Sequence, residues 1–210
     1  MSRFFGTLLF FYIFSCPLFC TTADEWVRKT EETFLKAKTV QAVFTLRIDW
    51  KLRDTIEVKS GKIDIYNPDR YRVALDDALF ISNGETFYRY SGKGRQLVIN
   101  DVLDVQQDLT PGSWLFRYSD HYRPVSLDSA EVLGEKCYAV SMVSKGEARF
   151  QKLTVWISPA AGLLKKIETT DKNDNTAAYL IAKLTFDAPL PASLFSFKPP
   201  KGTEVIDMRE

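Results

Sequence analysis

Few residues in this chain could do acid–base or metal chemistry. The sequence holds one histidine, His121, and three cysteines, of which Cys16 and Cys20 lie near the amino terminus. A zinc site of the usual kind takes about four ligands, and one histidine with Cys137 cannot supply them. His121 follows Asp120 in a polar stretch, where the pair could act as a base with its orienting acid or could simply face water. We favour the exposed pair.

The sequence also lacks the motifs that activate a nucleophile or bind a phosphate. It contains no Gly-x-Ser-x-Gly turn and no phosphate-binding glycine loop. The nearest match, Ser-Gly-Lys-Gly at residues 91–94, is typical of a hairpin turn. Asp76 and Asp77 are adjacent, so on a strand their carboxylates would face opposite ways. The sequence therefore indicates a protein that is not an enzyme and that needs no cofactor and no metal.

The amino terminus is typical of an export signal. Arg3 is followed by an apolar run over residues 4–19 and then by small residues. The run is short for a membrane span, so the pattern predicts a signal peptide over residues 1–23 with cleavage before Asp24. We expect the mature chain in the periplasm.

Two other fates of the amino terminus stay open. The apolar run could remain as a membrane anchor, or Cys16 or Cys20 could be acylated as in a lipoprotein. The residues before each cysteine, Phe14-Ser15 and Leu18-Phe19, are larger than lipoprotein processing favours. After cleavage only Cys137 would remain, so the mature chain could form no internal disulfide.

The mature chain has the size and charge of one ordinary domain. Removing 23 of the 210 residues leaves 187, enough for a full hydrophobic core, and we expect a single domain over residues 24–210. Loss of Arg3 brings the 28 basic residues to 27, equal to the 27 acidic ones. A balanced charge without a basic stripe argues against nucleic-acid binding.

Two kinds of periodicity follow the signal. Residues 24–38 place apolar side chains three and four positions apart, which is typical of an amphipathic helix. From Val40 the period becomes two and predicts a long strand with one apolar face. A second strand, over residues 55–66, contains Gly61, where we expect a β-bulge.

Turn signals separate the remaining strands. Asn83-Gly84 between apolar runs predicts a hairpin. Further strands are expected at residues 70–75, 85–90, 96–99, 122–127, 136–143, 150–157, 163–169 and 176–185. Residues 101–118 lack alternation and indicate short helices or a lid. About ten strands in succession predict a mainly β domain built as an antiparallel meander.

A broad sheet with few helices cannot easily cover its apolar face. An apolar space under a partial cover would bind an apolar molecule, and a packed β-core without a cavity is the alternative. Strand alternation assigns these candidate cavity residues to the apolar face: Phe44, Leu46, Ile48, Trp50, Tyr71, Val73, Leu75, Tyr88, Tyr90, Val155 and Ile157. Each of them could equally belong to an ordinary core.

Four segments occur in a characteristic order. They are residues 38–44, 61–72, 81–90 and 194–205, and the last contains Phe-x-Phe-x-Pro-Pro-x-Gly from Phe195 to Gly202. Over most of its mature length the chain resembles the LolA family of periplasmic outer-membrane lipoprotein carriers. The resemblance implies an unclosed antiparallel β half-barrel of about eleven strands, with a few helices as a lid over an apolar cavity.

The resemblance also implies a lid and a mechanism for holding it closed. Family members often carry an arginine just before the proline that precedes the third strand, and this chain has Asn67 there. Arg70 or Arg72 could take its place. The lid candidates themselves are Trp114, Leu115 and Phe116, which follow the structure-breaking pair Pro111-Gly112.

The function implied by the resemblance is transport of acylated lipoproteins. A monomeric carrier of this kind would receive them from an inner-membrane ABC transporter of the LolCDE type. It would deliver them to an outer-membrane acceptor of the LolB type. The alternative within the same fold is a lipid-anchored acceptor or a lipoprotein-sensing regulator.

Overall fold

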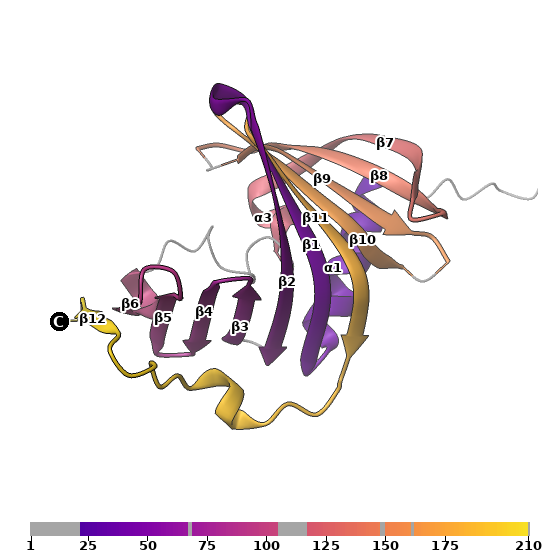
Figure 1. Ribbon diagram of the computed structural model, residues 1–210. Helices are drawn as coiled ribbons and strands as arrows, with labels where there is room; N and C mark the ends of the chain where they lie inside the picture. Colours follow the sequence, from indigo (N-terminus) through magenta and orange to yellow (C-terminus); the bar gives the residue numbers. More distant parts are fainter. Residues whose placement is uncertain (1–21, 67–68, 105–116, 148–149, 161, 210) are drawn as a thin grey trace, which may run out of the picture.

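The computed structural model describes residues 22–66, 69–104, 117–147, 150–160 and 162–209. In this part of the chain, one unclosed sheet of twelve strands curves around a helix, α1 (Figure 1). The prediction of a mainly β, unclosed half-barrel with few helices is therefore confirmed. The predicted signal peptide and the lid candidates at residues 114–116 lie outside the described residues.

The helical elements are few and mostly short. They are α1 (Ala23–Lys36), α3 (Tyr118–His121) and the 3₁₀ turns η1 (Lys51–Arg53), η2 (Val102–Asp104) and η4 (Ala192–Phe195). The strands are β1 (Thr39–Trp50), β2 (Thr55–Tyr66), β3 (Arg70–Leu75), β4 (Ala78–Asn83), β5 (Thr86–Ser91), β6 (Gln96–Asp101), β7 (Tyr122–Val132), β8 (Glu135–Ser144), β9 (Phe150–Ser158), β10 (Leu163–Asp171), β11 (Thr176–Phe186) and β12 (Glu204–Asp207).

The sheet consists of two meanders joined by one long-range pairing. Its strand order is β12-β6-β5-β4-β3-β2-β1-β11-β10-β9-β8-β7. Successive hairpins build β1 to β6 and β7 to β11, as alternation and turns predict. The expectation of one continuous meander was wrong, because β11 returns to pair antiparallel with β1. The twelfth strand, β12, which the sequence did not predict, adds parallel to β6.

Local contacts at both ends of α1 explain its bounds. At its start the Thr22 hydroxyl accepts a hydrogen bond from the Glu25 amide, and the Glu25 carboxylate accepts one from the Thr22 amide. This reciprocal capping box satisfies amides that the first turn of a helix leaves unpaired. The helix ends at Lys36 rather than at the predicted Lys38, whose amide donates to the Asp187 carboxylate at 2.8 Å.

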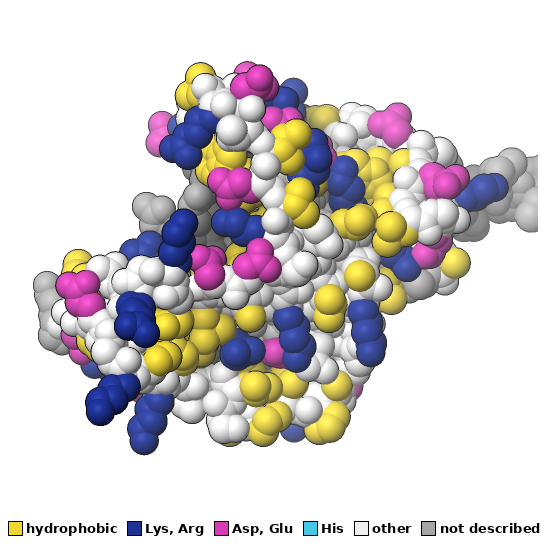
Figure 2. Space-filling model, in the orientation of Figure 1, with side chains coloured by type: hydrophobic (Ala, Val, Ile, Leu, Met, Phe, Trp, Pro, Cys, Tyr) yellow, Lys and Arg dark blue, Asp and Glu magenta, His cyan; other side chains and the backbone are white. Residues whose placement is uncertain are grey.

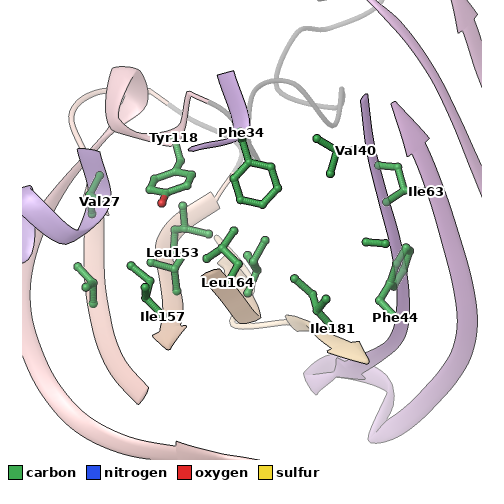
Figure 3. Packing of buried hydrophobic residues seen from close by; sticks show 14 of the residues in the cluster. Val27, Phe34, Val40, Phe44, Ile63, Tyr118, Leu153, Ile157, Leu164 and Ile181 are labelled. Atoms are coloured by element: carbon green, nitrogen blue, oxygen red, sulfur yellow. The ribbon is translucent and has the colours of Figure 1, made fainter. Parts of the chain in front are cut away.

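The hydrophobic core lies on the face of the sheet that packs against α1, here called the inner face. Residues directly opposite one another in antiparallel strands point to the same side of a sheet. Val40, Ala42 and Phe44 of β1 therefore share the inner face with Ile63 and Ile65 of β2. Figure 3 shows side chains from β1 and β2 pointing toward those from α1, β9 and β10 inside the curve.

The predicted bulge at Gly61 is not observed. Gly61 pairs in unbroken register with Phe44 on β1 and with Leu75 on β3. A Cβ atom at this position would collide with the Phe44 ring and would lie 2.9 Å from Leu75 Cδ2. The glycine is needed because that ring lies against its backbone. The irregularity is on the other side of β1, between Val43 and Phe44 in the pairing with β11.

The opposite face of the sheet, here called the outer face, carries a second and smaller core. Beyond β11 the chain continues through η4 and packs Phe195 against β3 and β4. Ile81, Leu97 and Phe195 are buried there, and Phe197 contacts Tyr90 with ring centroids 5.2 Å apart. The C-terminal segment therefore covers the outer face of β3 to β6 before β12 joins the sheet edge.

Candidate functional site

The inner face divides into two halves that differ in their cover. Over β1, β2 and β7 to β11 the cover is α1: Trp26 contacts Tyr138 with ring centroids 5.2 Å apart, and Phe34 contacts Phe186 at 5.4 Å. In Figure 1, α1 lies behind β1, β10 and β11. The inner-face side chains of β3 to β6 are mostly half-buried, although Ser82 is buried and Arg89 is exposed. We call these regions the covered half and the half-buried half.

Most of the predicted cavity residues lie on the inner face. Phe44 and Leu46 are buried on β1, and Ile48 packs against the same core. Trp50 lies at the end of the β1–β2 hairpin, where its indole N–H donates to Glu57 at 3.0 Å. Arg53 stacks on the same ring, 5.5 Å from its centroid. Trp50 therefore belongs to the hairpin tip and not to the core cluster.

Val155 and Ile157 belong to the covered half. Both are fully buried inner-face residues of β9 and form part of the packed core. A ligand could reach them only after the cover of the covered half has moved. Their prediction as cavity residues therefore applies only to a conformation in which this cover has moved.

Tyr71, Val73 and Leu75 belong to the half-buried half. They pack against the edge of the core on β3, and burial raises the pKa of Tyr71 above its ordinary value. Two further aromatic residues, which the sequence analysis missed, lie beside Tyr71. Phe87 has its ring centroid 6.4 Å from that of Tyr71 and 6.5 Å from that of Phe80.

The placement of Tyr88 and Tyr90 on the cavity face was wrong. In the ladder from β3 through β4 to β5, Tyr71 pairs with Ser82, which pairs with Phe87. Phe87 therefore shares the inner face, and its neighbour Tyr88 points to the other side. Tyr90 contacts Phe197 on the outer face.

Arg70 and Arg72 do not lie over the inner face. In the sheet, Arg72 lies opposite Asp64 of β2 and Ile81 of β4, so its side chain points to the outer face. The guanidinium of Arg70 stacks on Tyr66, 4.2 Å from the ring centroid, and lies 5.9 Å from that of Phe195. Arg70 therefore helps to hold the C-terminal segment, and within the described residues the register places both arginines on the outer face.

The covered half is tightly packed in this conformation. A cavity of about 20 Å³ lies between Phe34 of α1 and a wall that includes Phe44, Ile63 and Tyr179. Such a space is about the size that one water molecule needs, whereas ligand pockets measure roughly 300–1,000 Å³. An acyl chain can enter this half only if α1 moves away from the sheet.

A larger hollow lies on the outer face and has a different character. It measures about 530 Å³ and is lined by charged residues, among them Arg47, Lys166 and Glu168, as well as by apolar ones. Lys166 pairs with Glu168 at 2.8 Å and lies over the Trp156 ring, 4.1 Å from its centroid. A charged, open surface of this kind is a poor match for a bare hydrocarbon chain, so we take the inner face as the site.

The residues with possible chemistry are scattered. His121 is exposed at the end of α3. Ser91 ends β5, and residues 92–94 lie in the turn before β6. Asp76 and Asp77 lie in the turn between β3 and β4 rather than on a strand. Among the described residues, no three His, Cys, Asp or Glu side chains are grouped to hold a metal ion. Both signs of charge are interspersed on the face in Figure 2.

No helix in the described ranges combines the length and the apolar character that a membrane crossing requires.

The comparisons with known proteins agree with the geometry of the sheet. The profile of a family described as "Outer membrane lipoprotein carrier protein LolA" matches residues 35–198. This chain belongs to the LolA family. The matched region contains β1 to β11 and every inner-face strand residue named above, whereas most of α1 and all of β12 lie outside it.

Individual relatives of the LolA family are distant. An outer-membrane lipoprotein carrier protein of Nitrosomonas europaea is 25% identical over 203 residues, covering 95% of this chain and 98% of its own. An uncharacterized protein of Methanocaldococcus jannaschii is 24% identical over 187 residues, and the match spans 88% of this chain but only 53% of that protein.

Among solved structures, an uncharacterized conserved protein from Thermus thermophilus has a TM-score of 0.57 at 13% identity. It covers 88% of this chain and 98% of its own. This likeness shows that the fold is shared.

Proposed function

We propose that this chain is a periplasmic, non-enzymatic carrier that shelters the acyl chains of lipoproteins on the inner face of its half-barrel. The observation that carries the proposal is the inner face itself, whose apolar cluster extends over β1 to β3 and β7 to β11 and is half-buried on β3. Membership of the LolA family and carrier proteins among its relatives support it. The signal-like residues 1–23 support export to the periplasm.

The energetics explain why such a cover is needed. Exposing an acyl chain to water costs about 0.8 kcal/mol per methylene, so three chains of about 15 methylenes cost on the order of 36 kcal/mol. No lipoprotein crosses an aqueous space against that cost without shelter. In the proposed route an inner-membrane ABC transporter loads the carrier, and an outer-membrane acceptor unloads it.

The half-buried half is the proposed point of first contact with an acyl chain. Tyr71, Phe80 and Phe87 form an aromatic surface there. Val73, which lies opposite Phe80, and Leu75 extend this surface along β3. This surface needs less rearrangement than the covered half, where α1 must leave the sheet. We propose that the chain then extends toward Phe44 and Ile63 as the cover opens.

The proposal is tested with two neighbouring substitutions. Val73→Glu places a carboxylate on the inner face, and Ala74→Glu places one on the outer face opposite Lys62. Burying a carboxylate against a bound apolar chain is costly, so Val73→Glu should weaken binding of a triacylated peptide by about ten-fold or more. Ala74→Glu should bind it like the wild type. Circular dichroism checks that both variants are folded.

The unacylated peptide is the ligand control. Equal binding of acylated and unacylated peptide by the wild type would rule out a carrier of acyl chains. Equal weakening by Val73→Glu and Ala74→Glu would show that the inner face is not the binding surface. Intact mass of the exported protein, with or without a diacylglyceryl group on Cys16 or Cys20, separates a free carrier from an anchored acceptor.

A further inference from the structure

One charged side chain is buried under the cover of the inner face. Of the five buried residues of α1, Glu31 is the charged one, and it is 7% exposed. Its carboxylate accepts two hydrogen bonds from Ser119 on α3, from the backbone amide at 2.7 Å and from the hydroxyl at 2.6 Å. Residues 31 and 119 are far apart in the sequence, so the contact joins two separate covering elements.

The short helix α3 is held from its other side as well. The Lys145 ammonium group donates to the Ser119 carbonyl at 2.7 Å, and the Lys145 amide donates to the His121 carbonyl at 2.9 Å. Tyr118 is fully buried, and in Figure 3 its ring lies between Val27 and Phe34 of α1. The charged groups that act on Glu31 are Asp120 and Lys145.

This contact differs from the apolar contacts around it in how it responds to opening. When α1 separates from the sheet, Trp26 and Phe34 lose contacts that water cannot replace. Glu31 loses two hydrogen bonds but regains full hydration, which offsets much of that loss. The two hydrogen bonds of the buried carboxylate therefore fix where α1 docks. They stabilise the docked state less than the contacts of an apolar side chain would.

We propose that the Glu31–Ser119 contact is a releasable latch between α1 and α3 that regulates access of acyl chains to the covered half of the inner face. This inference rests on the proposed carrier function. With the latch closed, the cavity beside Phe34 measures about 20 Å³, so the binding-competent state is the one with α1 displaced. The apparent affinity for an acyl chain then scales with the population of that open state.

The test weakens the latch without changing charge. Ser119→Ala removes one of the two donors to Glu31, and Glu31→Asp keeps the charge but shortens its reach. Ser126→Ala is the matched control, because the Ser126 hydroxyl donates to the Asp128 carboxylate at 2.9 Å on the exposed surface of β7. The ligand is a fluorescent peptide with one palmitoyl group, and the same peptide without it is the control.

Two measurements are made on each protein. Amide hydrogen exchange at residue 119 reports whether the latch is open, and titration reports the affinity for the palmitoylated peptide. A hydrogen bond to a charged group shifts an equilibrium by about ten-fold or more. Ser119→Ala and Glu31→Asp should therefore exchange about ten-fold faster at residue 119 and bind the peptide about ten-fold more tightly. Ser126→Ala should match the wild type in both.

The outcomes separate the latch from the carrier function. Unchanged exchange at residue 119 in both latch variants would overturn the latch. Faster exchange with unchanged affinity would also overturn it, because opening would then not control access. If the wild type does not distinguish the palmitoylated from the plain peptide, the carrier function itself fails, whatever the exchange rates show. If Ser119→Ala does not fold, Glu31→Asp decides by the same two readouts.

Discussion

Replacement of Gly61 by alanine should destabilise the protein, although alanine is the better strand residue in general. A Cβ at position 61 would meet the edge of the Phe44 ring and would lie 2.9 Å from Leu75 Cδ2. The Phe44 ring cannot yield easily. Phe44 is 6% exposed, and its ring lies 5.7 Å from that of Tyr179 on the neighbouring strand β11. The extra methyl group is therefore forced into a packed interior.

The expected magnitude follows from two opposing effects. Inserting a methyl group into a packed core costs about 1–3 kcal/mol. Alanine also restricts the unfolded chain more than glycine does, which returns roughly 0.4–1 kcal/mol. The net loss in the free energy of unfolding should be about 1–2 kcal/mol. Urea denaturation followed by circular dichroism measures it.

Gly146→Ala is the matched control. A Cβ at Gly146 would have no heavy atom within 4 Å, so this variant should be neutral or slightly stabilised. Phe44→Leu is the matched suppressor, because it removes the ring atoms that collide with residue 61. The double variant should then lose less stability than the sum of the two single losses, by about 1 kcal/mol. If Gly61→Ala is as stable as Gly146→Ala, the packing of Phe44 against the Gly61 backbone has been misjudged.

Three other predictions follow from burial and charge. Leu46, 4% exposed on the covered half, should not tolerate Leu46→Glu, which is expected to cost several kcal/mol; a melting temperature near that of the wild type would contradict this. Phe195→Ala should cost about 3 kcal/mol and free Arg70, so that limited proteolysis cleaves the C-terminal segment faster; equal cleavage would argue that Phe195 does not anchor it. Burial raises the pKa of Glu31 above its ordinary 4.5, so its contribution to stability is fully present below pH 4.5 and is lost as pH rises through the raised pKa. The stability of the wild type minus that of Glu31→Gln should therefore fall as pH rises above 4.5 in denaturation curves, and a rise would refute the sign.

The strands and their turns could be predicted from the sequence because their causes are local. The alternation of apolar and polar residues predicts the first and last residues of β1 and β2 almost without error. The hairpin at Asn83 closes as its side chain predicts, with Asn83 Oδ1 accepting from the amides of Glu85 and Thr86 and with Gly84 at a φ of 99°. Such signals depend on a few neighbouring residues and need no knowledge of the rest of the chain.

The long-range pairings could not be predicted in this way. Nothing local in β11 shows that it returns to β1, and β12 joins the sheet only because η4 and Phe197 first pack on the outer face. The four residues of β12 are too few for a periodicity to be recognised. Tertiary contacts decide both pairings.

The error over Tyr88 and Tyr90 has a precise physical origin. In a hairpin, the loop length fixes which residue of one strand lies opposite which of the next. Tyr71 lies opposite Ser82, and Ser82 lies opposite Phe87, so odd positions of β5 face inward. Alternation within β5 alone, without this register, placed Tyr88 and Tyr90 on the apolar face. Following the pairs through the Asp76–Asp77 and Asn83–Gly84 turns would have identified Phe80 and Phe87 from the sequence.

In the proposed function, the two halves of the inner face also bear on how the carrier releases its cargo. An acyl chain that displaces α1 gains apolar contacts with the sheet, but Trp26, Phe34 and Tyr118 lose theirs. The net affinity is the difference between these two terms, since a ligand shifts an equilibrium only by its preference for one state over the other. A covered half that repacks on itself therefore weakens binding without any loss of apolar character in the site. That is what unloading requires, because the cavity that α1 refills is the same one that the acyl chain must leave.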